Sequence, residues 1–291
     1  MLLLDGKATA QTIQEELSST IAAEGKKGIR PPGLAVIMVG DNPASQIYVR
    51  NKENACARVG IVAEGCHLPE TTTEQSLLAH IHEYNARKDI DGILVQLPLP
   101  RHISAAACLL AIHPDKDVDG FHPENAGRLT LGLPGLAPCT PQGIIELLRR
   151  YDLSPRGKKA VVVGRSNIVG KPLALMLAQP LEYANATVTL CHSATSNLAR
   201  ECREADFLFL SIGRPRFFGP DMVKKGAVVV DVGINRLSDK KICGDADFDA
   251  LKDVVSAITP VPGGVGPMTI AMLLKNTVQA WMVHRALEER A

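Results

Sequence analysis

The stretch AVVVGRSNIVGKP, from Ala160 to Pro172, carries the clearest fold signal in this chain. A short apolar run ends at Gly164, and a second glycine, Gly170, precedes a lysine and a proline. A buried strand that leads through a glycine-containing turn into a helix is typical of phosphate-binding loops. The sequence therefore predicts a nucleotide-binding α/β unit that begins near residue 160.

The spacing of the glycines separates two classes of phosphate-binding loop. A Walker loop has four residues between its glycines and a hydroxyl residue after its lysine. Here residues 165–169 separate the glycines, and Pro172 takes the place of the hydroxyl residue. The dinucleotide fingerprint fits the context better, although Ser166 replaces its second glycine and Gly170 comes one residue late. A strand-to-helix turn that binds no ligand is the alternative interpretation.

The residues around the loop indicate which dinucleotide is bound. The next predicted strand, ATVTLC, leads into HSATS, which has no carboxylate to bind the hydroxyls of an unmodified ribose. Arg165 stands where a guanidinium could bind an additional phosphate. The missing acid and the arginine together predict NADP rather than NAD as the cofactor.

Strand-like and helix-like stretches alternate along the rest of the chain. Apolar strands are predicted at 33–40, 61–68 and 91–100, and a helix at 43–59 has Asn42 as its N-cap and Gly60 just past its end. After residue 160, further strands are predicted at 186–191, 206–213 and 227–233. Strands separated by helices form mainly parallel sheets, because parallel neighbours need a crossover connection.

The expected fold class is α/β with two domains and a cleft between them. Residues 1–120 are predicted to form an N-terminal α/β catalytic domain, completed by a long amphipathic C-terminal helix at 268–291. Residues 121–150, which begin in a segment rich in Pro, Gly and Asp, are predicted to be a junction and a linking helix. Residues 151–267 are predicted to form a Rossmann-like NADP-binding domain.

Composition excludes several other classes of protein. The 291 residues are 46% hydrophobic and 22% charged, and the net charge of +1 gives no reason to expect nucleic acid or an anionic membrane as a partner. No apolar run is long enough to span a bilayer, and the N-terminus lacks the basic region of a signal peptide. Seven scattered cysteines without a CxxC pair predict reduced thiols in a cytoplasmic protein, with no metal site.

Polar residues in the N-terminal half form a second group of candidates. Tyr48 and Lys52 lie four residues apart and therefore share one face of the predicted helix. The same spacing occurs in short-chain dehydrogenases, but there the pair follows the glycine loop, and here it precedes it. Gln96 ends an apolar strand, at the edge where parallel sheets bind ligands, and could orient a lysine ammonium. An amphipathic helix with a solvated lysine is the alternative.

Two loops complete the set of unusual motifs. The segment DKDVDGF places Asp119 beside a glycine; a turn accounts for Asp115 and Asp117, which leaves Asp119 free to bind a ligand. The later residues do not continue as a calcium-binding loop. The segment TPVPGGVGPMT, residues 259–269, lets the backbone approach a ligand closely, although a plain loop is also consistent with it.

Seven stretches, taken in order, closely resemble the bifunctional methylenetetrahydrofolate dehydrogenase/methenyltetrahydrofolate cyclohydrolase (FolD) family. They are YVRNKENACARVGI, VQLPLP, DKDVDGF, PCTPQG, GRSNIVGKP, DVGIN and PGGVGPMT. The resemblance implies that 5,10-methylenetetrahydrofolate gives a hydride to NADP⁺ and that water then opens the methenyl product to 10-formyltetrahydrofolate. It also implies a cytoplasmic homodimer in one-carbon metabolism, which supplies purine and amino-acid biosynthesis.

The resemblance also assigns roles to individual residues. Lys52 would serve the hydrolytic step, and Gln96 would position it. Tyr48 would stack near the pterin ring and Asp119 would hydrogen-bond to it. Further substrate contacts are implied for Leu97, Pro262, Gly263 and Gly264, and NADP contacts for Gly164, Arg165, Ser166, Ser193 and Ile234.

Two alternatives belong to other functional classes. A shikimate-type NADP dehydrogenase has the same two-domain plan, but VQLPLP and PGGVGPMT have no place in it. A catalytically silent NADP-binding regulator is the second alternative, and the presence of both Tyr48 and Lys52 argues against it.

Overall fold

The computed structural model describes residues 1–237 and 241–289, which fold into two compact units. The three-stranded unit consists of Gln11–Cys139 and Ile270–Ala291, and the six-stranded unit consists of Met1–Ala10 and Thr140–Thr269. Residues 290 and 291, the predicted end of the C-terminal helix, lie outside the described residues. The predicted α/β class with two domains agrees with this division.

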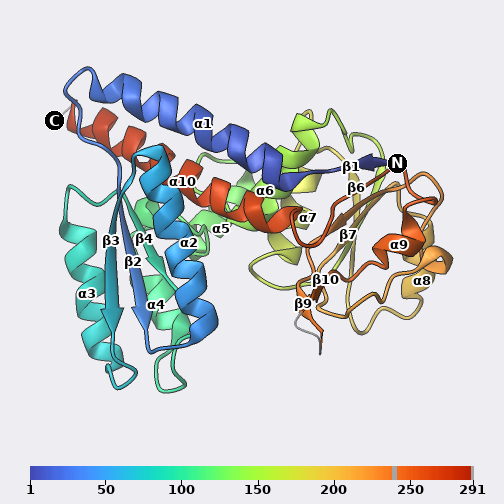
Figure 1. Cartoon of the computed structure of the whole chain (residues 1–291), viewed down its shortest axis with the longest axis horizontal. Helices are drawn as coiled ribbons and strands as arrows, with labels where there is room; N and C mark the ends of the chain where they lie inside the picture. The colour runs from blue at the N-terminus through green and yellow to red at the C-terminus, as the bar shows by residue number, and fades with distance from the viewer. Residues whose placement is uncertain (238–240, 290–291) are drawn as a thin grey trace. The chain divides into compact units, whose positions relative to one another are not determined.

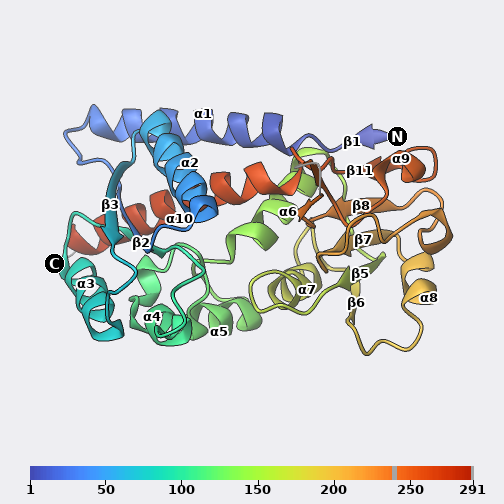
Figure 2. The ribbon, with the colours of Figure 1, turned by 60° about the horizontal axis from the view of Figure 1, so that its bottom comes forward.

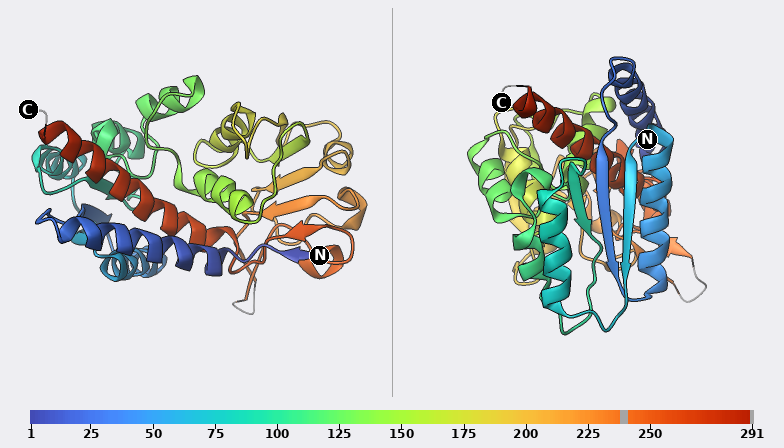
Figure 3. Two further views of the ribbon diagram at one scale, coloured as in Figure 1. Left: turned by 90° about the horizontal axis from the view of Figure 1, so that it is seen from above. Right: turned by 90° about the vertical axis from the view of Figure 1, so that its left-hand side faces the viewer.

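The three-stranded unit is built on a parallel sheet with the strand order β3-β2-β4. Its central strand β2 (Gly33–Val39) is buried along its whole length, and the right-hand view of Figure 3 shows its two neighbours beside it. The other elements are β3 (Val62–Leu68), β4 (Gly92–Val95), α2 (Pro43–Val59), α3 (Glu74–Ala86), α4 (Ala105–Ala111), the 3₁₀ turn η1 (Pro114–Lys116) and α5 (Pro123–Leu131).

Apolar side chains hold this unit together. Leu77 and Ile81 of α3 and Cys108 of α4 pack with β2 and β4 in one buried cluster. Two long helices, α1 (Gly6–Gly25) and α10 (Val265–Glu288), run side by side in Figure 1, and an ion pair of 2.8 Å joins Arg285 to Glu24. Trp281 of α10 is fully buried. The C-terminal helix is thus part of the core of this unit.

The six-stranded unit contains a parallel sheet with the order β1-β11-β8-β7-β5-β6, most of which can be followed in Figure 2. Its strands are β1 (Leu2–Leu3), β5 (Lys159–Val163), β6 (Thr187–Cys191), β7 (Phe207–Leu210), β8 (Val228–Asp231) and β11 (Ala257–Ile258). The other elements are α6 (Cys139–Arg150), α7 (Gly170–Ala178), α8 (Leu198–Arg203), η2 (Pro220–Met222), α9 (Phe248–Leu251) and the small antiparallel pair β9 (Asn235–Arg236) and β10 (Ile242–Cys243).

The strand order identifies where this sheet can bind a ligand. From β5 the chain crosses to β6 on one side and later continues to β7 on the other side. The crevice at the carboxyl ends of β5 and β7 is therefore the topological switch point, which is the usual ligand-binding position of open α/β sheets. The Rossmann-like character predicted for this part of the chain is present.

The structure differs from the sequence analysis at the N-terminus and in the junction. Leu2 and Leu3 pair with β11, so the first ten residues belong to the six-stranded unit and not to the predicted N-terminal domain. Helix α5 lies within the predicted junction, where His122 caps its start and Gly132 its end. The predicted domain boundaries at 120, 150 and 267 otherwise stay a prediction.

Candidate active site

Helix α2 places Tyr48 and Lys52 one above the other on the same face. The helix starts where predicted, because the Asn42 side chain accepts a hydrogen bond of 3.2 Å from the Ser45 amide and Pro43 needs no amide partner. Tyr48 is 45% exposed, and Lys52, one turn later, is half-buried. The two side chains therefore line one surface, with the lysine deeper than the tyrosine.

The Lys52 ammonium is held by Gln96, which follows β4 directly. Lys52 Nζ donates to Gln96 Oε1 over 3.1 Å. The amide nitrogen of the same side chain donates to the Leu97 carbonyl at 2.7 Å, so its oxygen is left to face the lysine. The Gln96 backbone amide continues the sheet by donating to Ile37 at 2.8 Å. The end of a rigid parallel strand thereby fixes the position of the lysine nitrogen.

Asp119 differs from the two neighbouring aspartates. Asp115 pairs with Arg128 at 3.2 Å, and Asp117 is buried and accepts hydrogen bonds from the His122 amide and the Asn125 side chain. Within residues 1–237 and 241–289, the Asp119 carboxylate has no such partner. Burial raises the pKa of Asp119 to about 6, an effect that the nearby Lys52 charge opposes and Asp117 reinforces. Asp119 is thus an available acceptor close to Lys52.

A buried asparagine on α10 holds the loop that carries Asp119. Asn276 Nδ2 donates to the Val118 carbonyl at 2.8 Å and to the Ala137 carbonyl at 2.9 Å, and the Cys139 thiol also donates to Val118. Gly120 has a φ of 74°, and a Cβ there would lie 2.3 Å from Ala137. Asn276 was not among the predicted site residues; a polar side chain within the apolar face of the predicted C-terminal helix was the available signal.

The glycine loop of the six-stranded unit turns sharply at the carboxyl end of β5. Gly164 has a φ of 128°, and a Cβ there would lie 2.3 Å from Ser211 Oγ. A Cβ at Gly170 would lie 1.9 Å from the Gly164 carbonyl oxygen. Ser166 Oγ accepts from the amides of Val169 and Gly170 at 3.1 and 3.3 Å. The serine that replaces a glycine of the fingerprint therefore accepts from the backbone at the start of α7, whose N-cap residue is Val169.

The other predicted cofactor residues lie at the same edge of the sheet. Arg165 and Ser193 follow the carboxyl ends of the neighbouring strands β5 and β6, and both are exposed. Ile234 follows β8 and is 52% exposed. The Arg165 guanidinium makes no hydrogen bond or ion pair with any residue that the structure describes. An uncommitted cation at the switch point suits a phosphate group.

The segment with Pro262, Gly263 and Gly264 also belongs to the six-stranded unit. It follows β11 and leads into α10. The Gly263 carbonyl accepts from the Lys7 amide at 2.9 Å, and a Cβ at Gly6 would lie 1.8 Å from the Gly264 carbonyl oxygen. Its place in the unit that contains the glycine loop agrees with the predicted extent of the NADP-binding domain, residues 151–267, and its contact with the substrate stays a prediction.

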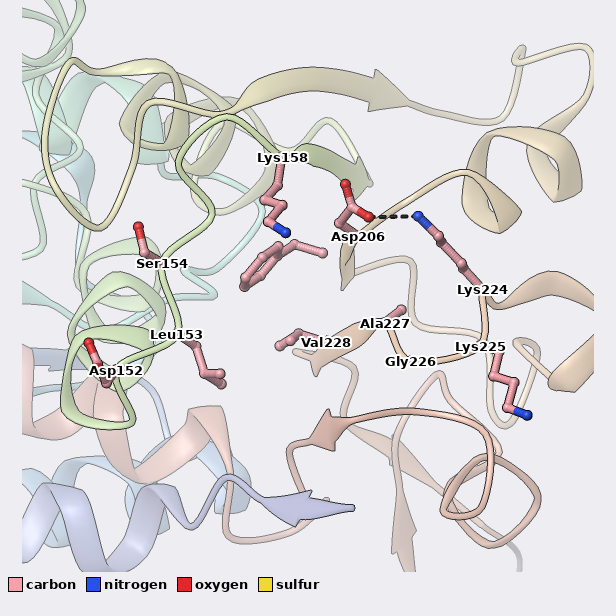
Figure 4. Close-up of a pocket in the computed structure, with 11 residues that line it drawn as sticks. Asp152, Leu153, Ser154, Lys158, Asp206, Lys224, Lys225, Gly226, Ala227 and Val228 are labelled. Atoms are coloured by element: carbon pink, nitrogen blue, oxygen red, sulfur yellow. Dashed lines mark hydrogen bonds and ion pairs between the residues drawn. The ribbon is translucent and has the colours of Figure 1, made fainter.

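A separate hollow of about 390 Å³ lies at the opposite, amino-terminal edge of the six-stranded sheet (Figure 4). Lys224 Nζ donates to Asp206 there at 2.7 Å, and Lys158 and Lys225 also line it. None of the predicted site residues contributes to this hollow. Parallel α/β sheets bind ligands at their carboxyl edge, so this amino-edge hollow is not the candidate cofactor site.

Over residues 1–237 and 241–289, no three His, Cys, Asp or Glu side chains are grouped so that they could hold a metal ion. None of the helices in these ranges is both long and apolar enough to cross a bilayer.

Family models match both parts of the chain. The model for the tetrahydrofolate dehydrogenase/cyclohydrolase catalytic domain matches residues 4–119, and the model for the NAD(P)-binding domain of the same family matches residues 138–285. The chain belongs to this family. Together the two matches cover nearly all of the sequence, and they confirm the resemblance found in its motifs.

Individual relatives agree with this assignment. A "Bifunctional protein FolD" from Nitratidesulfovibrio vulgaris is 67% identical over 99% of this chain and 100% of the relative. The crystal structure of the FolD methylenetetrahydrofolate dehydrogenase/cyclohydrolase from Campylobacter jejuni is 51% identical, with a TM-score of 0.94, over 97% of this chain and 99% of that one. The Trypanosoma brucei family member, solved with NADP and an inhibitor, is 38% identical, with a TM-score of 0.91 over 97% of both chains.

Proposed function

We propose that the residues described above carry out both reactions of the family. The chain is an NADP-dependent methylenetetrahydrofolate dehydrogenase and methenyltetrahydrofolate cyclohydrolase of one-carbon metabolism. In the first reaction 5,10-methylenetetrahydrofolate loses a hydride and becomes the methenyl cation. In the second, water adds to that cation, a ring C–N bond breaks, and 10-formyltetrahydrofolate and a proton are released. The two alternatives, a shikimate-type dehydrogenase and a silent regulator, are not favoured.

The observation that carries the hydrolytic half is the Lys52–Gln96 hydrogen bond of 3.1 Å. Ring opening requires a proton to leave the attacking water and a proton to reach the departing nitrogen. We assign this proton transfer to Lys52 Nζ, which the strand-end glutamine holds in one place.

Folate recognition is assigned to residues around this pair. Asp119 offers a carboxylate with free acceptor positions, which suits the N–H groups of the pterin ring. Tyr48 presents an exposed aromatic face on the same helix surface as Lys52 and is assigned to stack on the pterin. Further substrate contacts are proposed for Leu97 and for the segment Pro262–Gly264.

NADP binding is assigned to the carboxyl edge of the six-stranded sheet. When bound there, NADP⁺ supplies the hydride acceptor of the first reaction. The residues fit such a ligand, because Gly164 allows close approach to the β5 turn and Arg165 is free to meet the additional phosphate. Contacts are also proposed for Ser166, Ser193 and Ile234. The hydride step itself requires mainly alignment of donor and acceptor.

The proposed oligomeric state, cellular location and metabolic role are inferred from the family. We propose a homodimer in the cytoplasm that contributes to purine and amino-acid biosynthesis and binds no nucleic acid. Light scattering after size exclusion should give twice the chain mass of 31.2 kDa. A monomer at micromolar concentration would contradict the dimer and leave the two activities unaffected.

Absorbance spectroscopy tests the combined function. Mixing the protein with 5,10-methylenetetrahydrofolate and NADP⁺ should produce NADPH and a methenyltetrahydrofolate band that rises and then decays. A shikimate-type dehydrogenase or a silent NADP-binding protein would give no such band. Absence of the band with fully folded protein would therefore reject the dehydrogenase assignment.

A further inference from the structure

Two buried carboxylates lie side by side behind the carboxyl edge of the six-stranded sheet. Asp231 is the last residue of β8 and is 3% exposed; Asp245 follows β10 and is fully buried. Two glycines make room for them: a Cβ at Gly233 would lie 2.3 Å from Asp245 Oδ1, and one at Gly244 would lie 1.9 Å from Asp231 Oδ2. The backbone around both carboxylates is therefore shaped to hold them.

The Asp245 carboxylate joins two loops of the candidate cofactor edge. It accepts hydrogen bonds from the three consecutive amides of Ile212, Gly213 and Arg214, at 2.7, 3.1 and 2.8 Å. These amides directly follow Ser211, the residue against which Gly164 packs. The same carboxylate accepts from Asn235 Nδ2 at 2.9 Å, and Asn235 directly follows Ile234. One side chain thus holds the loop after β7 and the loop after β8.

Asp231 holds Asp245 in place. Its carboxylate accepts from the amides of Asp245 and Ala246 at 3.0 and 2.8 Å, and from the Gly233 amide at 2.9 Å. None of the ion pairs formed by residues 1–237 and 241–289 involves Asp231 or Asp245. The buried charges are therefore compensated by oriented backbone amides. Because these amides come from the loops themselves, the loop conformations and the carboxylate positions depend on each other.

We propose that Asp245 is a positioning residue for NADP, which sets the shape of the loops at Ile212–Arg214 and Ile234–Asn235 without touching the cofactor. The proposal rests on the NADP site assigned above. A carboxylate is required because four donors converge on it, whereas an amide side chain has a single acceptor oxygen and an NH₂ group that would face a donor. Removing the charge should distort the cofactor edge and leave the Lys52 site intact.

Asp245→Asn tests this, with Asp247→Asn as the matched control. Asp247 lies two residues away and only caps α9, by accepting from Ala250 at 3.4 Å. NADPH affinity is measured by fluorescence titration, and cyclohydrolase kinetics are measured with methenyltetrahydrofolate alone, a reaction that needs no cofactor. We expect the NADPH Kd of Asp245→Asn to rise about tenfold or more, since charge-assisted hydrogen bonds are lost. Cyclohydrolase kcat and KM should stay at their wild-type values, because Lys52, Gln96 and Asp119 belong to the other compact unit.

Four outcomes are distinguishable. An unchanged NADPH Kd in Asp245→Asn overturns the positioning role. A parallel loss of NADPH binding and cyclohydrolase activity with a lowered Tm makes Asp245 a purely structural residue and also overturns it. If Asp245→Asn does not fold, Asn235→Ala removes one of the four bonds and should give the same selective loss, about threefold in Kd. Failure of wild type to bind NADPH would instead reject the proposed cofactor site.

Discussion

Arg165 is the residue that should decide which dinucleotide is used. Its guanidinium is exposed at the carboxyl end of β5, and no acidic residue follows β6 in the position that would hold an unmodified ribose. Arg165→Ala should cost about 1.5–3 kcal/mol in kcat/KM with NADP⁺, the range for a hydrogen bond to a charged group, and much less with NAD⁺.

Steady-state dehydrogenase assays with both cofactors measure this difference. Arg156→Ala is the matched control, because Arg156 is an exposed arginine just before the amino end of β5 and should leave both values unchanged. Equal use of NADP⁺ and NAD⁺ by wild type would contradict the assignment of Arg165.

Asp119 should make folate binding depend on pH. Burial raises its pKa to about 6, so the carboxyl group is ionised above that pH and becomes protonated as the pH falls through it. The pterin ring presents N–H donors, and protonation removes acceptor capacity from the carboxylate. We therefore expect the KM for methenyltetrahydrofolate to rise as the pH falls from 7 to 5.

The control for this prediction is Asp119→Asn, whose side chain does not titrate. The variant should bind folate weakly at all pH values and should show no step near pH 6. If the step persists in Asp119→Asn with its midpoint unchanged, another group is responsible and Asp119 is a turn residue.

At the scale of elements, α10 supports the loop that carries Asp119. Asn276→Leu would leave the buried carbonyls of Val118 and Ala137 without their amide donor. The Val118 carbonyl keeps the Cys139 thiol as a donor, whereas the Ala137 carbonyl is left unsatisfied. An unsatisfied buried group costs about 1–3 kcal/mol, so the free energy of unfolding should fall by about that amount and the folate KM should rise. Urea denaturation and cyclohydrolase kinetics measure the two effects.

Gln279→Ala is the comparison on the same helix. Gln279 makes one long contact, 3.3 Å to the Gly135 carbonyl, and is half-buried. Its loss should cost less than about 1 kcal/mol, because a single neutral hydrogen bond contributes little net stability. Equal destabilisation by the two variants would show that the Asn276 contacts have no special role.

Elements with local signals were predictable from the sequence. Helix α2 has its boundaries where Asn42, Pro43 and Gly60 predict them, because caps and glycines act through nearby backbone groups. Strands β1 and β11 were missed, since each has only two residues; β1 forms by pairing with β11 across the whole chain, and β11 also pairs with β8. Helix α5 was missed because Pro123 at its first position, Gly127 inside it and Gly132 at its C-cap resemble the residues of a loop.

In the candidate site, too, contacts with a local sequence signal were predictable and long-range contacts were not. A contact between Gln96 and a lysine could be anticipated, because the carboxyl end of a parallel strand is a fixed place in such folds. The hydrogen bonds that the Asp245 carboxylate accepts from the amides of residues 212–214 could not be anticipated, since they depend on how loops that are separate in the sequence pack together. Asn276 was likewise hidden, because its partners lie more than one hundred residues away in the sequence.

At the scale of the whole molecule, the proposed functional residues fall into two groups. Arg165, Asp245 and the glycine loop belong to the six-stranded unit, and Lys52, Gln96 and Asp119 belong to the three-stranded unit. Hydride transfer requires alignment of two ligands, whereas ring opening requires proton transfer by a side chain. The two activities should therefore be separable by single substitutions in either unit.

Lys52→Met tests this separation most directly, with methenyltetrahydrofolate formation and decay followed in one time course. Methionine keeps much of the length of the lysine stem and removes the amine. Lys26→Met, at an exposed residue just after the end of α1, is the control. We predict that decay slows by at least about a hundredfold, the lower range of acid–base assistance, while formation with NADP⁺ stays measurable and the methenyl compound accumulates. Decay at the wild-type rate would contradict the account and remove Lys52 from the hydrolytic step.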